Sequence, residues 1–103
     1  MSGSHPRSIF ITGAAAGIGR AVAERFAREG WVVGLFDVDE AAVQALSQQL
    51  GQQFGAGRAV AGRLDVADAE GWAQSLAAFV QAAGGRLDVL FNNAGVAVTA
   101  PFD

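Results

Sequence analysis

The stretch SIFITGAAAGIGRAVAERFAREG, residues 8–30, decides the fold. It begins with a short apolar run, continues with three glycines within seven residues, and then takes up the spacing of a helix. Ile18, Val22 and Phe26 are four residues apart, so they share one face of a helix that we predict over residues 17–29. The stretch is therefore a strand, a glycine-rich turn and a helix, in that order.

The same alternation of short apolar runs and helical spacing continues along the chain. Strands are predicted over residues 8–12, 31–36, 58–64 and 87–91. Helices are predicted over residues 17–29, from a cap at Asp37 or Asp39 to Leu50, and from a cap at Asp68 to the glycine pair at 84 and 85. Gly51 is expected to end the second helix. The order of elements is βαβαβαβ.

Short continuous apolar strands, each separated from the next by one helix, are typical of parallel strands covered on both faces. We therefore predict an α/β fold, a doubly wound parallel sheet with strand order 3-2-1-4. Residues 1–7 are expected to form a flexible tail. Residues 8–103 are expected to form the first half of a single domain, because the complete fold has further strands beyond the fourth.

Composition excludes several classes of protein. The 103 residues are 51% hydrophobic and 17% charged with a net charge of −3, and no basic patch stands out, so no nucleic-acid partner is expected. No run of about 18 apolar residues occurs, so no membrane span is expected either. Cysteine is absent, which excludes disulfides and cysteine-ligated zinc and fits the reducing cytoplasm. No metal ligands are assigned.

The glycine loop is expected to bind an anion. At the carboxyl edge of a parallel sheet, the first N–H groups of the following helix have no partner within the helix and carry the positive end of its dipole. Gly13 would permit the tight turn, Gly17 the close approach of a pyrophosphate, and Gly19 the close packing of the helix on the sheet. Asp37 follows the second strand, 18 residues after Gly19, near the spacing of about 20 for a ribose-binding carboxylate. The sequence therefore predicts a dinucleotide site.

Three short motifs resemble the short-chain dehydrogenase/reductase family. They are TGAAAGIG at residues 12–19, LDV at residues 64–66 and NNAG at residues 92–95. The resemblance covers nearly the whole chain and implies the N-terminal, cofactor-binding half of an NAD-binding Rossmann domain. The residues that it assigns to the cofactor are Gly13, Ala14, Ala15, Ala16, Gly17, Ile18 and Gly19 in the loop, Asp37 and Val38 after the second strand, Asp65 and Val66 at the adenine, and Asn93, Ala94 and Gly95 beside the adenine-side ribose. Asn92 is expected to tie strands together instead.

Asp37 predicts a preference for NAD over NADP. Its carboxylate can accept hydrogen bonds from both hydroxyls of the adenosine ribose, whereas a 2′-phosphate brings like charge close to it. Two unit charges about 4 Å apart repel by roughly 4 kcal/mol at an effective dielectric near 20. Ala16 stands where phosphate-preferring members of the family often carry a basic residue, and Ala15 where a serine often supports the phosphate. Two alternatives stay open, Asp37 as the cap of the second helix and Asp65 as a loop cap.

The resemblance implies that the complete protein transfers a hydride between NAD(H) and an alcohol or carbonyl substrate. In that family a tyrosine exchanges the hydroxyl proton, a lysine four residues later lowers the pKa of that tyrosine, and a serine orients the substrate oxygen. This chain has no tyrosine, and its seven basic residues are all arginine. No catalytic residue is therefore assigned, and the chain is expected to be inactive alone.

Two other functions compete with the dehydrogenase. One is a nucleotide-binding module without catalysis, and the other is an S-adenosylmethionine methyltransferase, against which NNAG and the three-glycine spacing argue. The strand predicted at residues 87–91 would form an exposed sheet edge with unpaired backbone groups. Self-association through this edge is therefore expected.

Overall fold

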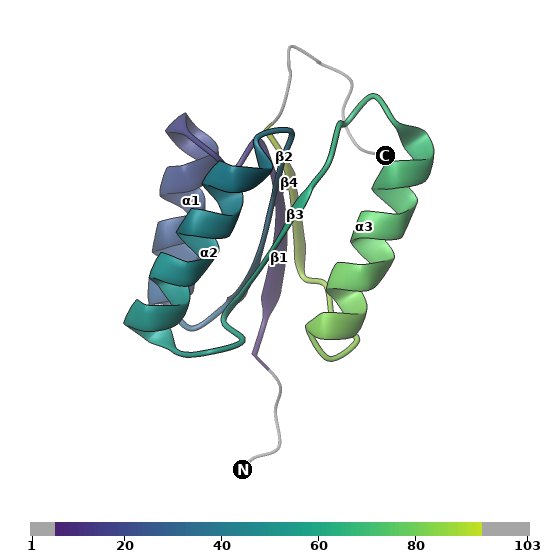
Figure 1. The fold of residues 1–103 in the computed structure, drawn as a ribbon. Helices are drawn as coiled ribbons and strands as arrows, with labels where there is room; N and C mark the ends of the chain where they lie inside the picture. The colour runs from purple at the N-terminus through teal and green to yellow at the C-terminus, as the bar shows by residue number, and fades with distance from the viewer. Residues whose placement is uncertain (1–5, 94–103) are drawn as a thin grey trace.

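The computed structural model describes residues 6–93, which form a parallel sheet with helices on both faces (Figure 1). The strands are β1 (Ser8–Thr12), β2 (Val32–Asp37), β3 (Ala59–Arg63) and β4 (Val89–Asn92). The helices are α1 (Gly17–Arg28), α2 (Glu40–Phe54) and α3 (Ala69–Ala82). The predicted order of elements is confirmed over this part of the chain, where no helix is both long and apolar enough to cross a membrane. Ala94, Gly95 and most of the predicted tail lie outside the described residues.

The strands of the described chain lie in the order β3-β2-β1-β4, and each neighbouring pair is parallel, as predicted. Thr12 at the end of β1 is the Cα partner of Phe36 in β2 and of Asn92 in β4. At the end of β2, Asp37 is the Cα partner of Arg63 in β3. The carboxyl ends of all these strands therefore meet at one edge, uppermost in Figure 1, where α1 and α2 begin.

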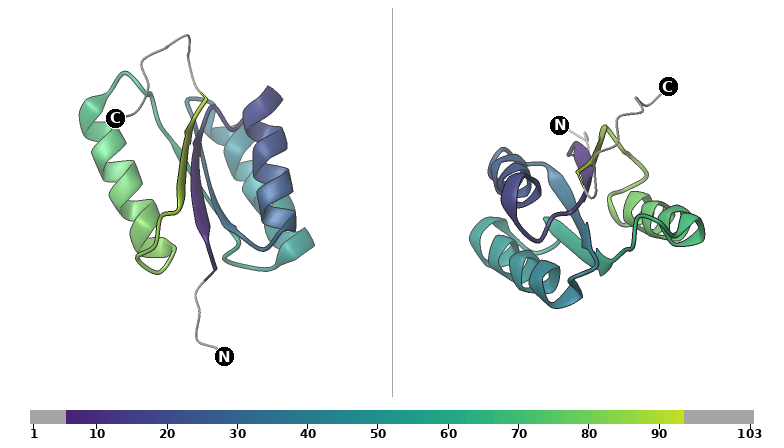
Figure 2. Two further views of the ribbon diagram at one scale, coloured as in Figure 1. Left: turned by 180° about the vertical axis from the view of Figure 1, so that it is seen from behind. Right: turned by 90° about the horizontal axis from the view of Figure 1, so that it is seen from above.

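The helices form two different layers on the sheet. α1 and α2 cover one face and α3 covers the other, as the view from above shows (Figure 2). Aliphatic side chains such as Ile11 and Leu35 pack under α1 and α2. The layer under α3 is aromatic, because Phe10 stacks on Phe36 with ring centroids 4.6 Å apart and Phe79 of α3 meets Phe10 edge-on at 5.7 Å. Apolar burial on both faces holds the helices against the sheet.

The face of α1 predicted from Ile18, Val22 and Phe26 is only partly buried. Val22 and Phe26 pack partly buried against the core, but Ile18 is 67% exposed. The fully buried residues of the helix lie one position further along, at Gly19, Ala23 and Ala27. The prediction of this face was based on the spacing of the larger apolar side chains in the helix. A dense core instead places the smallest residues where the helix approaches the sheet most closely, because close packing leaves no room for larger ones.

The predicted end of the second helix was also wrong. α2 runs through Gly51 to Phe54 and ends at Gly55, whose φ of 123° is positive. Glycine inside a helix costs only about 1 kcal/mol relative to alanine, which packing can offset. The additional turn lets Phe54 pack partly buried against the core under α1 and α2.

The structure shifts the predicted strand limits by one or two residues. Trp31 and Leu87 precede β2 and β4, and Arg58 and Leu64 flank β3. The N–H of Trp31 donates to the carbonyl of Phe26 at 3.0 Å, so Trp31 belongs to the turn after α1. These residues are apolar or stand beside apolar residues, which favours a strand, but hydrophobicity does not locate the last hydrogen bond of a ladder.

Candidate functional site

The loop between β1 and α1 is held in place by its backbone. Gly13 and Gly17 have φ values of 67° and 62°, in the left-handed region where a side chain is strained. Between them, Ala14 is buried, and its N–H donates to the carbonyl of Phe36 in β2 at 3.2 Å. Gly17 is not required by close packing, since a Cβ at this position would meet no atom within 4 Å. The space in front of Gly17 is thus open to a ligand.

Gly19 lies against the turn that it helps to build. A Cβ on Gly19 would stand 2.1 Å from the Gly13 carbonyl oxygen and 2.9 Å from Asn93 Nδ2. The Asn93 amide in turn donates to the Gly13 oxygen at 3.3 Å. Gly19 is therefore closely packed, but its neighbours are the Gly13 carbonyl and Asn93 and not the strands of the sheet.

The start of α1 differs from the starts of the other two helices in the described chain. Asp39 caps α2 and Asp68 caps α3, and each of those helices has a glutamate in its first turn. The first turn of α1 has no acidic residue, and its N-cap, Ala16, offers no side-chain hydrogen bond. Since the N–H groups at a helix start carry partial positive charge, an anion is stabilised there.

Asp37 lies beside this loop. Its Oδ2 accepts a hydrogen bond from the Ala15 N–H at 3.1 Å, and its Oδ1 accepts one from the Asp39 N–H at 3.0 Å. The cap of α2 is Asp39, whose carboxylate accepts from the Ala42 N–H at 3.2 Å. This excludes the cap alternative for Asp37. An ionised carboxylate has about four acceptor positions, so Asp37 keeps capacity to accept further hydrogen bonds.

Asp65 and Val66 follow β3 at the same edge of the sheet. The exposed Asp65 accepts from the Ala67 N–H at 3.0 Å, which is the local turn role left open by the sequence. The Val66 carbonyl accepts from Trp72 Nε1 at 3.0 Å, and its side chain packs against the aromatic layer under α3. The loop is thus anchored to α3 while the Asp65 carboxylate faces solvent.

Two exposed apolar side chains flank the loop. Ile18 is 67% exposed and Val38 is 57% exposed, more than any other large hydrophobic residue in the described part of the chain. Both belong to the residues that the resemblance assigns to the cofactor. Exposed apolar groups beside a polar loop suit a ligand that has flat rings as well as charge.

The end of β4 is tied to the end of β1. Thr12 Oγ1 donates to Asn92 Oδ1 at 2.6 Å, across the strand pair. The strand-tying role predicted for Asn92 is therefore confirmed. Asn93 reaches the Gly13 carbonyl, as described above, whereas Ala94 and Gly95 lie outside the described residues.

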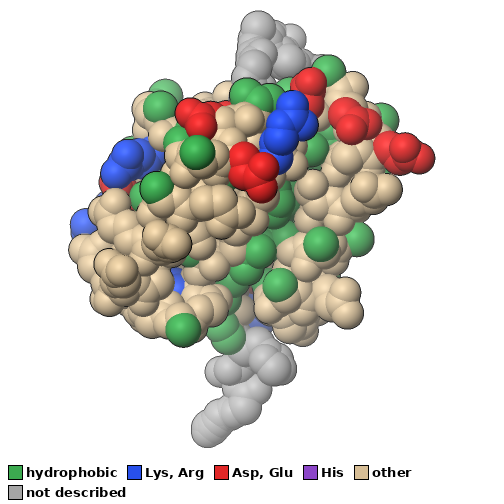
Figure 3. Space-filling view, viewed as in Figure 1, with side chains coloured by type: hydrophobic (Ala, Val, Ile, Leu, Met, Phe, Trp, Pro, Cys, Tyr) green, Lys and Arg blue, Asp and Glu red, His purple; other side chains and the backbone are tan. Residues whose placement is uncertain are grey.

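Sequence reasoning missed Arg63. It ends β3 beside Asp37, at the edge where charged side chains of both signs gather (Figure 3). The sequence held a signal for placing Arg63 at this edge, because Arg63 stands two residues before Asp65 at the end of a predicted strand. Residues 6–93 by themselves form no cavity at this edge of the sheet, so the site is open in the described part of the chain.

Comparisons with known proteins agree with this geometry. A family model described as short chain dehydrogenase matches residues 7–103. The chain is 45% identical over 91 residues to D-threitol dehydrogenase of Mycolicibacterium smegmatis and 40% identical over 93 residues to the uncharacterized oxidoreductase YuxG of Bacillus subtilis. These alignments cover 88% and 90% of this chain but only 34% and 13% of those proteins.

Solved structures give the same result. A short chain dehydrogenase/reductase from Burkholderia phymatum, in complex with NAD, superposes with a TM-score of 0.81 at 34% sequence identity. The match covers 93% of this chain and 33% of that one. The chain therefore spans about a third, or less, of the lengths of these relatives.

Proposed function

The chain belongs to the short-chain dehydrogenase family, and we propose that it binds NAD at the carboxyl edge of its sheet as the cofactor-binding part of an oxidoreductase. The observation that carries this proposal is the start of α1, which lacks an acidic cap and lies beside the Asp37 carboxylate. The start of α1 favours a negatively charged pyrophosphate, and the Asp37 carboxylate can accept hydrogen bonds from hydroxyl groups. A dinucleotide has both a pyrophosphate and ribose hydroxyls.

In the proposed complex each part of the edge has one task. The N–H groups at the start of α1 hold the pyrophosphate, and Gly17 leaves room for its approach. Asp37 accepts hydrogen bonds from the adenosine ribose, beside Val38. Asp65 and Val66 lie at the adenine and Asn93 lies beside the ribose; Ala94 and Gly95, outside the described residues, are assigned to the same ribose by the family resemblance alone.

The catalytic step belongs to the complete oxidoreductase. NAD, when bound, supplies the hydride acceptor for an alcohol or, in its reduced form, the donor for a carbonyl. This chain contributes binding and orientation, because without tyrosine or lysine it offers none of the acid/base pair. We accordingly assign residues 8–103 to the first half of one NAD-binding domain that is inactive alone. The cysteine-free sequence supports a cytoplasmic location.

The preference for NAD follows from the position of Asp37. Its carboxylate is held against the loop by the Ala15 N–H, so it cannot swing away from a 2′-phosphate without breaking that hydrogen bond. If half of the roughly 4 kcal/mol of repulsion survives screening, NAD is favoured by about thirtyfold.

Calorimetric titration of the chain with NAD and NADP tests the proposal. Asp37→Asn is expected to bring the two dissociation constants within about threefold of each other, because it removes the repelling charge. Asp39→Asn is the comparison variant, since it removes the same charge two residues away while asparagine still caps α2, and it should shift the preference for NAD much less than Asp37→Asn does. Equal affinity of the unchanged chain for NAD and NADP would contradict the preference, and no binding of either would contradict the site.

A further inference from the structure

Arg63 lies beside Asp37 on the same face of the sheet. The two residues are Cα partners in the parallel pair β2–β3, where neighbouring strands are about 4.8 Å apart. Side chains alternate between faces, and Leu35 and Ala61, two residues earlier in each strand, pack under α1 and α2. Asp37 and Arg63 therefore emerge toward this face at the carboxyl edge.

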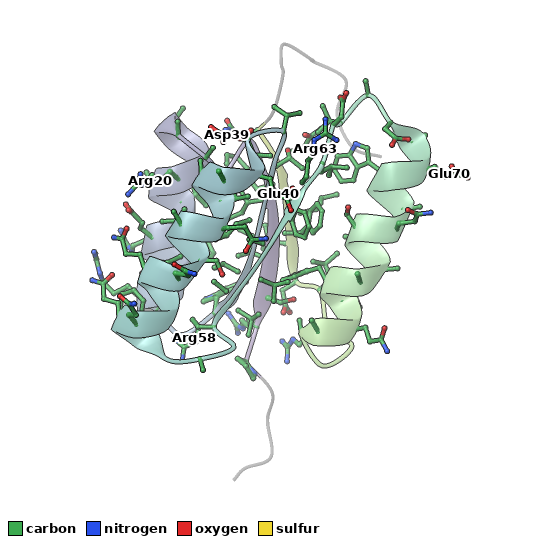
Figure 4. All side chains as sticks on the ribbon, in the orientation of Figure 1. Arg20, Asp39, Glu40, Arg58, Arg63 and Glu70 are labelled. Atoms are coloured by element: carbon green, nitrogen blue, oxygen red, sulfur yellow. The ribbon has the colours of Figure 1, made fainter. Side chains whose placement is uncertain are left out.

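Arg63 is an exposed arginine that engages no ion pair or hydrogen bond within residues 6–93. Other arginines of the described chain have partners: Arg20 with Glu24, Arg25 with Glu29, Arg58 with the Ala27 carbonyl and Arg86 with Asp88. Figure 4 shows Arg63 at the end of the sheet where Asp39 and Glu40 lie, with Arg58 at the opposite end. The guanidinium of Arg63 is thus available at the edge that holds the proposed site.

We propose that Arg63 is a specificity-determining residue that binds the 2′-phosphate of NADP and so limits the preference which Asp37 imposes. This inference rests on the proposed function. A guanidinium presents a fork of N–H donors that matches a phosphate, and its charge is permanent at neutral pH. NAD has a hydroxyl at the same position, so Arg63 acts on NADP far more than on NAD.

The neighbouring carboxylates set the size of the effect. Asp39 is committed to the cap of α2, and the Glu40 carboxylate lies in the first turn of the same helix. Their charges, together with Asp37, oppose the phosphate, so Arg63 reduces the discrimination between the two cofactors without reversing it. The chain is expected to bind NADP measurably, though more weakly than NAD.

The test compares the dissociation constants of NAD and NADP for the unchanged chain and three variants. Arg63→Gln is expected to weaken NADP by about fivefold or more and NAD by less than about twofold, since only the phosphate loses a charged partner. Arg63→Lys is expected to retain most of the NADP affinity because it keeps the charge. Arg28→Gln is the matched control, because Arg28 ends α1, at the opposite edge from the loop, and should change neither constant.

Salt provides a second readout. The difference in NADP affinity between the unchanged chain and Arg63→Gln should shrink from 0.05 to about 0.5 M salt, as an exposed charge pair is screened. Equal effects of Arg63→Gln on NAD and NADP, or no effect on either, would overturn the role of Arg63 and leave the NAD site intact. No binding of either dinucleotide would overturn the role of Arg63 and the proposed function together.

Discussion

At the scale of single residues, Gly17 and Gly19, near the junction of the β1–α1 loop with the helix, are glycines for different physical reasons. Gly17 has a positive φ but free space around it, so a side chain there would be strained and not blocked. Gly19 has no positive φ, yet a Cβ on it would overlap the Gly13 carbonyl and crowd Asn93. The glycine spacing alone does not separate these two requirements.

Alanine substitutions are expected to distinguish the backbone requirement at Gly17 from the packing requirement at Gly19. Gly19→Ala should lower the free energy of unfolding by about 3 kcal/mol or more, because backbone must move to admit the methyl group. Gly17→Ala should cost only about 1–2 kcal/mol, the price of left-handed angles for a side chain. Urea unfolding followed by circular dichroism measures both, and a smaller loss at Gly19 than at Gly17 would be inconsistent with the packing described here.

At the scale of elements, α2 shows how packing overrides a local stop signal. Gly51 lies inside the helix without a positive φ, and the helix ends at Gly55, where φ is positive. The last turn carries Phe54 onto the core. The tertiary contact of one aromatic side chain thus outweighs the low helix propensity of one glycine.

Gly51→Ala is therefore expected to stabilise the fold. A Cβ at Gly51 would meet no atom within 4 Å, so the gain is the difference in helix propensity, about 0.5–1 kcal/mol. The midpoint of urea unfolding should rise. Gly55→Ala is the control, and it should lower the midpoint because φ there is 123°. A fall for Gly51→Ala would mean that α2 ends earlier.

At the scale of the whole molecule, hydrogen bonds at both ends join β1 and β4, which are about 80 residues apart. Ser8 N–H donates to Asp88 Oδ2 at 2.9 Å and Asp88 N–H donates to the Ser8 carbonyl at 3.0 Å, while Thr12 and Asn92 are joined at the other end. The Ser8 amide, aided by the Arg86 guanidinium 2.8 Å from Oδ1, holds the pKa of Asp88 below its ordinary value. This end of the β1–β4 pair is therefore sensitive to acid.

The contribution of Asp88 to stability is expected to depend on pH. Because its pKa is lower in the folded chain, the contribution is complete above the unfolded pKa of about 3.9 and is lost as the pH falls through the lower folded value. Asp88→Asn should unfold at lower urea than the unchanged chain at pH 7, and this gap should narrow at acidic pH below about 4. A gap that stays constant over that range would contradict a charged role for Asp88.

The outer edge of β4 is expected to drive self-association. In the described chain β4 pairs with β1 on one side only, and Val89 is 36% exposed. Open backbone groups beside apolar side chains can pair with a second chain. Light scattering should show oligomers that grow with concentration, and Val89→Lys should reduce them. A monomer at every concentration would contradict this prediction.

The alternation of strands and helices, the strand order and the glycine loop could all be predicted from the sequence. These features depend on local spacing: apolar runs, helical periodicity and a carboxylate at a set distance from the loop. The spacing also indicated Asp37 as a candidate, whereas Asp65 and the link between strands through Asn92 were implied by the resemblance to the family. The limits of elements were less accurate, as Trp31 and Gly51 show, because hydrogen-bond ladders and packing decide them.

Only the tertiary structure decided which contacts each charged residue makes at the carboxyl edge of the sheet. Asp39 and not Asp37 caps α2, and Asp37 instead contacts the Ala15 N–H. Arg63 lies next to Asp37 only because β3 pairs with β2 in one register. Such neighbours are 22 or 26 residues apart in the chain, so no local pattern encodes them. They follow from the pairing of strands, which depends on how the two faces of the sheet bury their apolar side chains.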